Sequence, residues 1–431
     1  MQKKHMYRLI FDHLKEWKNK KPRKPLIIQG ARQVGKTWVM KAFGSSYFKK
    51  HVYINFESNI NLQHVFEADL NIARIITVFE IETGISIDEE TLIILDEIQE
   101  AKGGLTALKY FYENAPQYYL MAAGSFLGVS LQKGHTFPVG KVDFLRLYPM
   151  NFEEFLLNIK EELLLKNLKE QNWKVLSAFH EKLISLLRVY YFVGGMPEAV
   201  NEYINSNNLK QVRAIQNNIL LGYENDFSKH APIESVPKIR LVWQSIIGQL
   251  AKENKKFVYG QLKTGARAKE FESAINWLVN SGLVHKSNRI AKPGIPLLAY
   301  ADMDAFKLYL LDIGLLNAMA GFGEKNLLHK NQILVEHKGA MTEQFVSQEL
   351  KIKYDLFYWS AENGTSELDF VVQVEDALIP VEVKAEENLK AKSLRVFVDK
   401  YKPTHAIRTS MSFYRDDDWL KNIPLYAVFT I

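Results

Sequence analysis

The stretch from Gly30 to Thr37 constrains this chain more than any other, because it fits the pattern G-x-x-x-x-G-K-[ST] at every fixed position. The apolar run from Pro25 to Gln29 precedes it and predicts a buried strand, and a helical pattern begins at Thr37. Glycines let backbone N–H groups turn inward around phosphate oxygens, and a helix N-terminus adds partial positive charge. The stretch therefore predicts a phosphate-binding loop between a strand and a helix.

This loop predicts a nucleotide ligand. Lys36 can reach the β- and γ-phosphates, and the Thr37 hydroxyl can ligate Mg2+. The residues expected to contact the nucleotide are those of the whole loop, namely Gly30, Ala31, Arg32, Gln33, Val34, Gly35, Lys36 and Thr37.

A second stretch, Thr91 to Glu97, is an apolar run that ends in two acids. Continuous apolar runs are typical of parallel strands buried on both faces. We expect Asp96 to hold Mg2+ directly or through water, and Glu97 to orient or deprotonate the attacking water. Two acids alone are better explained as a solvated strand end, but with the glycine loop they favour nucleotide binding and hydrolysis.

Further strands are predicted at 51–57, 118–125 and 142–147, and an amphipathic helix is predicted over 6–18. Strands that alternate with helices indicate a three-layer α/β fold with a parallel sheet. Ser125 ends the strand at 118–125 and is a candidate sensor of the γ-phosphate; the alternative is a simple turn serine.

Length and composition narrow the class of protein. The 431 residues are too many for one core, so several domains are expected. The absence of cysteine excludes disulfides and thiolate chemistry and suits a cytoplasmic location. Apolar runs are too short for a membrane span, so we expect no membrane partner and no signal peptide. The net charge of +6 permits a polyanion partner.

The expected domains are a P-loop ATPase core over 1–155, a helical lid over 156–230, a winged helix over 231–325 and a C-terminal α/β domain over 326–431. In the third, two helices joined by a turn and followed by a strand are typical of a winged helix-turn-helix. Lys263, Arg267 and Lys269 would begin its recognition helix, although Glu270 and Glu272 oppose them. DNA contact and a structural or protein-binding role both remain open.

The C-terminal domain carries two alternating segments, Glu367 to Val374 and Leu378 to Lys384, that predict a β-hairpin. A turn at Asp376-Ala377 would set Asp369 opposite Lys384, and a turn at Glu375-Asp376 would set Asp369 opposite Glu382. Either turn keeps Asp369, Glu382 and Lys384 on one face of the sheet.

Glu343 lies on or beside the buried face of a helix predicted over 339–350, where a carboxylate needs a partner. It could join Asp369 and Glu382 as a third ligand of a divalent metal, with Lys384 as the cation near an attacking water. The alternative is a salt-bridged hairpin in which Lys384 pairs with Asp369 and Glu343 is paired elsewhere.

With these motifs in hand, the chain resembles the bacterial and archaeal AAA-type P-loop ATPases whose C-terminal half is a conserved domain of unknown function. Further marks of that family are Gly124-Ser125, Leu147 to Phe155, Gly194 to Ala199, Leu311 to Leu315 and the hairpin. The hairpin also resembles the restriction-endonuclease-like core, whose pattern is Asp followed by Glu-x-Lys. Such cores occur both as nucleases and as inactive remnants.

The resemblance implies an enzyme that binds ATP and hydrolyses it with Mg2+, with Glu97, Lys36 and Ser125 as the catalytic residues. It implies coupling to DNA binding or processing through the C-terminal domains, and it is compatible with a homo-oligomer. The alternative is a signalling switch that acts on a protein partner and carries an inactive nuclease-like domain. Related proteins often have Gly-Arg before the fifth strand where this chain has Gly140-Lys141, so no arginine finger is assigned, although Arg146 is near.

Overall fold

The computed structural model describes residues 6–124, 140–252, 255–323, 335–361, 366–385 and 391–431. The chain divides into two compact units. The first contains Met1–Tyr148 with Asn280–Gly282, and the second contains Pro149–Val279 with Leu283–Ile431. Ser125 lies outside the described residues.

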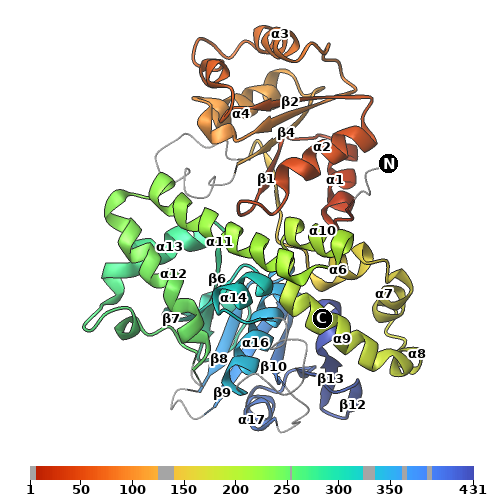
Figure 1. Ribbon diagram of the computed structural model, residues 1–431, viewed down its shortest axis with the longest axis vertical. Coiled ribbons are helices and arrows are strands. Elements are labelled where there is room, and N and C mark those ends of the chain that lie inside the picture. Colours follow the sequence, from red (N-terminus) through yellow and green to blue (C-terminus); the bar gives the residue numbers. More distant parts are fainter. Residues whose placement is uncertain (1–5, 125–139, 253–254, 324–334, 362–365, 386–390) are drawn as a thin grey trace. The chain divides into compact units, whose positions relative to one another are not determined.

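The first unit is built on a five-stranded sheet with the order β2-β3-β4-β1-β5. Figure 1 labels β1, β2 and β4 of this sheet. All neighbouring strands are parallel, which confirms the predicted α/β fold with a parallel sheet. The strands are β1 Leu26–Gln29, β2 Lys50–Asn55, β3 Thr91–Asp96, β4 Tyr119–Ala123 and β5 Asp143–Arg146.

Helix α1 Ile10–Asn19 precedes β1. The helices between the strands are α2 Lys36–Tyr47, α3 Ile72–Thr83 and α4 Gly104–Asn114, with the short 3-10 helices η1 Ile60–His64 and η2 Ile98–Glu100. All six residues of β3 are buried, as its continuous apolar run predicts. Ile93 and Leu95 share one core cluster with Phe79 of α3 and Phe111 of α4. Each such side chain contributes about 1.5–3 kcal/mol by leaving water, so this core holds β3 against α3 and α4.

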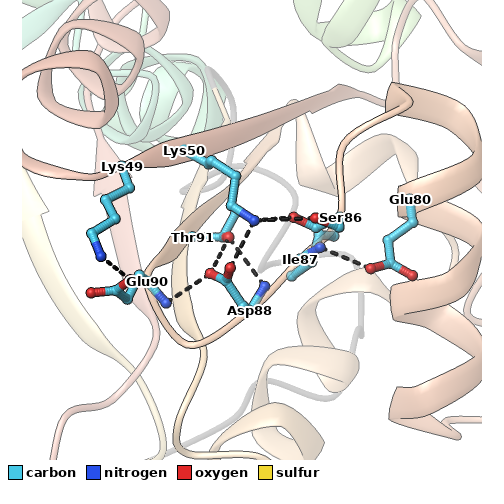
Figure 2. Close-up of polar contacts among 8 residues, drawn as sticks. All are labelled: Lys49, Lys50, Glu80, Ser86, Ile87, Asp88, Glu90 and Thr91. Carbon is cyan, nitrogen blue, oxygen red and sulfur yellow. Dashed lines mark hydrogen bonds and ion pairs between the residues drawn. The ribbon is translucent and has the colours of Figure 1, made fainter.

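A polar cluster fixes the connection from α3 to β3 beside the start of β2 (Figure 2). The Lys50 ammonium group lies 2.7 Å from Asp88 and also donates to the backbone oxygen of Ser86. The Thr91 hydroxyl donates to Asp88 at 2.7 Å. The Lys50 bond and then the Thr91 bond lower the pKa of Asp88 to about 2. These contacts help to set the register in which β3 begins next to β2.

The second unit begins with helices and ends with a large sheet (Figure 1). Its helices are α6 Phe152–Asn158, α7 Glu162–Lys169, α8 Trp173–Leu176, α9 His180–Val193, α10 Pro197–Ser206, α11 Leu209–His230, α12 Val236–Leu250, α13 Ala268–Asn280, α14 Ile313–Met319, α16 Val335–Lys351 and α17 Lys392–Tyr401. The run from α6 to α11 agrees with the helical pattern that follows the first sheet in the sequence.

Eight strands form the sheet of the second unit, in the order β12-β13-β11-β10-β9-β8-β6-β7. They are β6 Val284–Ile290, β7 Ala301–Leu310, β8 Phe357–Ser360, β9 Glu367–Val374, β10 Ala377–Val383, β11 Ile407–Ser410, β12 Arg415–Asp417 and β13 Leu420–Pro424. The sheet is mixed, because β6 pairs with β8 in parallel and with β7 antiparallel. The strands that follow α13 thus belong to the same sheet as the C-terminal hairpin.

The Gly-Gly-Met-Pro turn has a structural role in this unit. The backbone N–H of Gly195 donates to Asp312 at 2.6 Å, and its carbonyl accepts from the N–H of Met150 at 2.7 Å. A Cβ atom at Gly195 would lie 1.9 Å from the Met150 oxygen, so no other residue fits there. Asp312 also caps α14 by accepting from Leu315. Three separate sequence motifs therefore meet at one buried set of hydrogen bonds.

Candidate active site

The phosphate loop lies between β1 and α2 and uses backbone conformations that favour glycine. Gly35 caps α2 with φ +95°, and Gln33 has φ +65°. At Gly30 a Cβ atom would lie 2.3 Å from the Leu147 carbonyl oxygen. The two fixed glycines of the motif are therefore required by a left-handed turn and by a close backbone approach.

Arg8 stabilises this loop through hydrogen bonds to backbone carbonyl groups, a role that was not predicted from the sequence. Its side chain is only 2% exposed and donates to the carbonyl oxygens of Val34 at 2.9 Å and Tyr148 at 2.7 Å. These bonds connect the loop with the end of the segment that follows β5. A charged residue inside the apolar helical pattern of residues 6–18 was the one available signal.

Lys36 is buried in the loop that it belongs to. Its ammonium group donates to the carbonyl oxygens of Gly30 at 2.9 Å and Ala31 at 2.8 Å. Burial lowers its pKa to about 8, although Glu97 and Asp96 act in the opposite direction. The cation is thus held beside the turned backbone, where phosphate oxygens bind in a loop of this kind.

Asp96 ends the buried strand β3 and contacts the loop directly. The Thr37 hydroxyl donates to its Oδ2 at 2.6 Å, and the Glu97 backbone N–H donates to its Oδ1 at 3.2 Å. Tyr53 of β2 also donates to Oδ2, at 3.0 Å, a contact that the sequence analysis missed. A hydroxyl and a carboxylate at this separation are the hard oxygen ligands that Mg2+ prefers, so the residues fit that ion.

Glu97 follows in a left-handed conformation, with φ +50° and ψ +46°, at the start of η2. A non-glycine residue in this region costs about 1 kcal/mol or more, and such strain is concentrated at functional sites. Gln99 donates to the Glu97 carboxylate at 2.6 Å and fixes its direction. The geometry therefore holds a second carboxylate next to Asp96 as a candidate general base.

The C-terminal hairpin adopts the second of the two expected registers. Val374 pairs with Ala377, so the turn is Glu375-Asp376, with Glu375 at φ +50°. Asp369 accepts from the backbone N–H of Val383 at 2.8 Å. Continuing the register places Asp369 opposite Glu382 and on the same face of the sheet.

Lysines neutralise the carboxylates of this face. Lys384 pairs with Glu382 at 2.6 Å. Glu343 of α16, which is buried, pairs with the equally buried Lys307 at 3.1 Å and also with Lys255. Burial opposes the ionisation of Glu343, but these two ammonium groups outweigh it and lower its pKa to about 2.

Two further features complete this cluster. Tyr309 donates to Glu343, and Lys307 also pairs with Glu367 at 2.7 Å. Burial and then repulsion from Glu343 raise the pKa of Asp369 to about 7. The sequence analysis missed Lys255, Lys307 and Tyr309; a lysine within the otherwise apolar end of β7 was the detectable signal.

Three parts of the chain match known protein families. Residues 22–156 match the family described as "AAA domain", and residues 184–326 and 338–428 match two domains of unknown function (DUF8612 and DUF4143). The chain is an AAA-type P-loop ATPase domain fused to domains of unknown function. No curated protein matches it.

Solved structures resemble the chain weakly. A Walker-type ATPase of Pyrococcus abyssi is 13% identical with a TM-score of 0.46, and the match covers 74% of this chain and 97% of that chain. The Aeropyrum pernix ORC1 protein in complex with DNA is 13% identical with a TM-score of 0.31, covering 72% and 90%. Drosophila ORC bound to DNA is 11% identical with a TM-score of 0.24, covering 75% and 95%. With TM-scores below 0.5, these similarities carry no functional argument.

Three further residues singled out from the sequence, Ser125, Lys141 and Arg146, come at or near the ends of β4 and β5 along the chain. β4 lies between β1 and β3 and ends at Ala123, two residues before Ser125. Ser125 itself lies outside the described residues, so its role as sensor stays a prediction. Lys141 pairs with Glu113 at 3.0 Å, and Arg146 is exposed at the end of β5.

Among the described residues, no group of three or more His, Cys, Asp or Glu side chains is arranged to hold a metal ion. The helices in the described part of the chain include none that is both long and apolar enough to traverse a lipid bilayer.

Proposed function

We propose that the AAA domain binds ATP with Mg2+ and hydrolyses it. The observation that carries this proposal is the 2.6 Å hydrogen bond from the Thr37 hydroxyl to Asp96, because it joins the phosphate loop to the acid at the end of β3. A metal bound by these two side chains would neutralise phosphate charge and orient the γ-phosphate.

Each residue of the site has a distinct proposed role. Lys36 would transfer its hydrogen bonds from the carbonyls of Gly30 and Ala31 to phosphate oxygens. Glu97 would orient the attacking water and accept its proton, with Gln99 fixing the carboxylate. Ser125 would lie between Glu97 and the γ-phosphate and act as the sensor of that phosphate.

Phosphate release from ATP tests this proposal. The wild-type protein should turn over ATP in the presence of Mg2+ and stop when EDTA is added. Lys36→Ala should lose tight ATP binding, because the loop has no other buried cation facing the phosphates. A wild-type protein that binds no ATP in isothermal titration would contradict the proposal.

We propose further that ATP hydrolysis is coupled to DNA binding through the second unit. The support is the net charge of +6 together with the exposed Lys263, Arg267 and Lys269 near the start of α13. ATP turnover should rise when DNA is added. DNA binding should weaken steeply as the salt concentration rises, because contacts with DNA phosphates release counterions. Turnover that ignores DNA at low salt would contradict this coupling.

The second candidate function is a switch that acts on a protein partner, with an inactive nuclease-like domain. The observation that favours it is the pairing of Glu382 with Lys384 and of Glu343 with Lys255 and Lys307. These ammonium groups occupy positions beside the carboxylates that a divalent metal would need. Cleavage of single- or double-stranded DNA with Mn2+, lost in Asp369→Ala, would exclude this candidate.

A further inference from the structure

The structure assigns a positioning role to Tyr53: its hydroxyl orients the Asp96 carboxylate for Mg2+ binding. This inference rests on the proposed function and adds a residue that the phosphate-loop and acid motifs do not contain.

Register places Tyr53 beside the site. β2 runs parallel to β3, and Asn55 pairs with Asp96. Side chains of paired residues point to the same face, and so do those of residues two apart on one strand. Tyr53 therefore shares the face of Asp96, two residues earlier on the neighbouring strand, and its long side chain spans that separation to reach Oδ2 at 3.0 Å.

The hydrogen-bond chain gives the Tyr53 hydroxyl a direction. The side-chain oxygen of Asn55 accepts the backbone N–H groups of Glu57 at 2.9 Å and Ser58 at 3.0 Å. Its amide nitrogen must then face the other way, where it donates to the Tyr53 oxygen at 3.1 Å. The tyrosine oxygen is already an acceptor, so its own proton is directed to Asp96.

Lys41 connects this tyrosine to the helix of the phosphate loop. Its ammonium group lies 3.4 Å from the centre of the Tyr53 ring. Lys41 is one helical turn after Thr37 on α2, so both side chains lie on the same side of that helix. Asp96 Oδ2 thus receives two donors that are both tied to α2. Thr37 is part of that helix, and Tyr53 contacts it through the cation–π interaction with Lys41.

Removing one hydroxyl tests the inference. In Tyr53→Phe the ring and its contact with Lys41 remain, but Asp96 loses one donor. The Mg2+ concentration that gives half-maximal binding of the β,γ-imido analogue of ATP should rise about tenfold, the low end of what loss of an outer-shell partner costs a metal site. Binding of the analogue in EDTA and the melting temperature should not change. Tyr110→Phe on α4 is the matched control and should behave as wild type.

The outcomes separate this inference from the proposed function. An unchanged Mg2+ requirement in Tyr53→Phe overturns the positioning role, even when the wild-type protein hydrolyses ATP. A raised requirement together with a lower melting temperature and weaker binding in EDTA also overturns it, because Tyr53 would then act on the fold. Absence of turnover in the wild-type protein contradicts hydrolysis alone, since the titration measures binding.

Discussion

Lys307 and Glu343 form an ion pair at 3.1 Å in which both side chains are buried, at 0% and 1% exposure. Lys307 lies on β7 and Glu343 on α16, so the pair joins a sheet and a helix of the second unit. An isolated charge at such a site is costly, and each partner is therefore tolerated because of the other.

Lys307→Met should destabilise the second unit by about 3–5 kcal/mol, because it leaves Glu343 buried with one fewer cation. Lys421→Met is the matched control in the same unit: the side chains of its pair with Asp416 are 47% and 52% exposed, and the loss of that pair should cost about 1 kcal/mol or less. Urea unfolding measures both. Equal losses of unfolding free energy in the two variants would contradict the role of Lys307 in neutralising the buried Glu343.

ATP binding should weaken as the pH rises through about 8, the lowered pKa of Lys36. Phosphate oxygens favour the ammonium form, so binding above pH 8 must take up a proton that the free side chain has lost. Isothermal titration at pH 9 in buffers of different ionisation enthalpy should detect proton uptake on binding. Affinity that is constant from pH 7 to 9.5, with no uptake, would contradict a buried and neutralised Lys36.

The second unit should lose stability as the pH rises from about 4.5 to 8. Burial raises the pKa of Glu349 to about 8, and its Oε2 has no hydrogen-bond partner within the described residues. A raised folded-state pKa means that the unfolded chain releases the proton first, so each step in pH up to 8 favours unfolding.

Glu349→Gln should remove part of this loss while keeping the acceptor for the Phe152 backbone N–H. The wild-type free energy of unfolding should fall by about 2 kcal/mol or more between pH 5 and 9, and the variant should fall by less. The exposed Glu272→Gln serves as control and should follow wild type. Asp312 and Asp369 carry raised pKa values as well, so some pH dependence should remain in every variant.

Local pattern was sufficient to predict the parallel sheet and the phosphate loop. The glycine loop, and the apolar run of β3 with its terminal acids, are each a short continuous segment of the sequence. Each segment predicts its own local structure for a stated physical reason. Alternation likewise predicted the shared face of Asp369 and Glu382. It did not choose between the two hairpin turns, because both preserve alternation; the observed turn depends on Glu375 accepting a left-handed conformation.

Residues with distant partners were beyond such reasoning. Arg8 bonds to Tyr148 across 140 positions, and Lys307 and Lys255 meet Glu343 across 36 and 88. Tyr53 reaches Asp96 across 43 positions, through a strand pairing that the sequence did not specify. Side chains of this kind acquire a role only when the topology is known, whereas Ser125 still depends on its motif alone.

The central claim is that Glu97 is the base of an ATP-hydrolysing site, and the nucleotide retained by Glu97→Gln tests it most directly. After incubation with ATP and Mg2+, the wild-type protein should hold or release ADP and phosphate. The Gln variant keeps the shape but not the base, so it should bind ATP with similar affinity and retain it unhydrolysed, with turnover reduced about 100-fold or more. Wild-type turnover in the Glu97→Gln variant, with ADP recovered from it, would contradict the account.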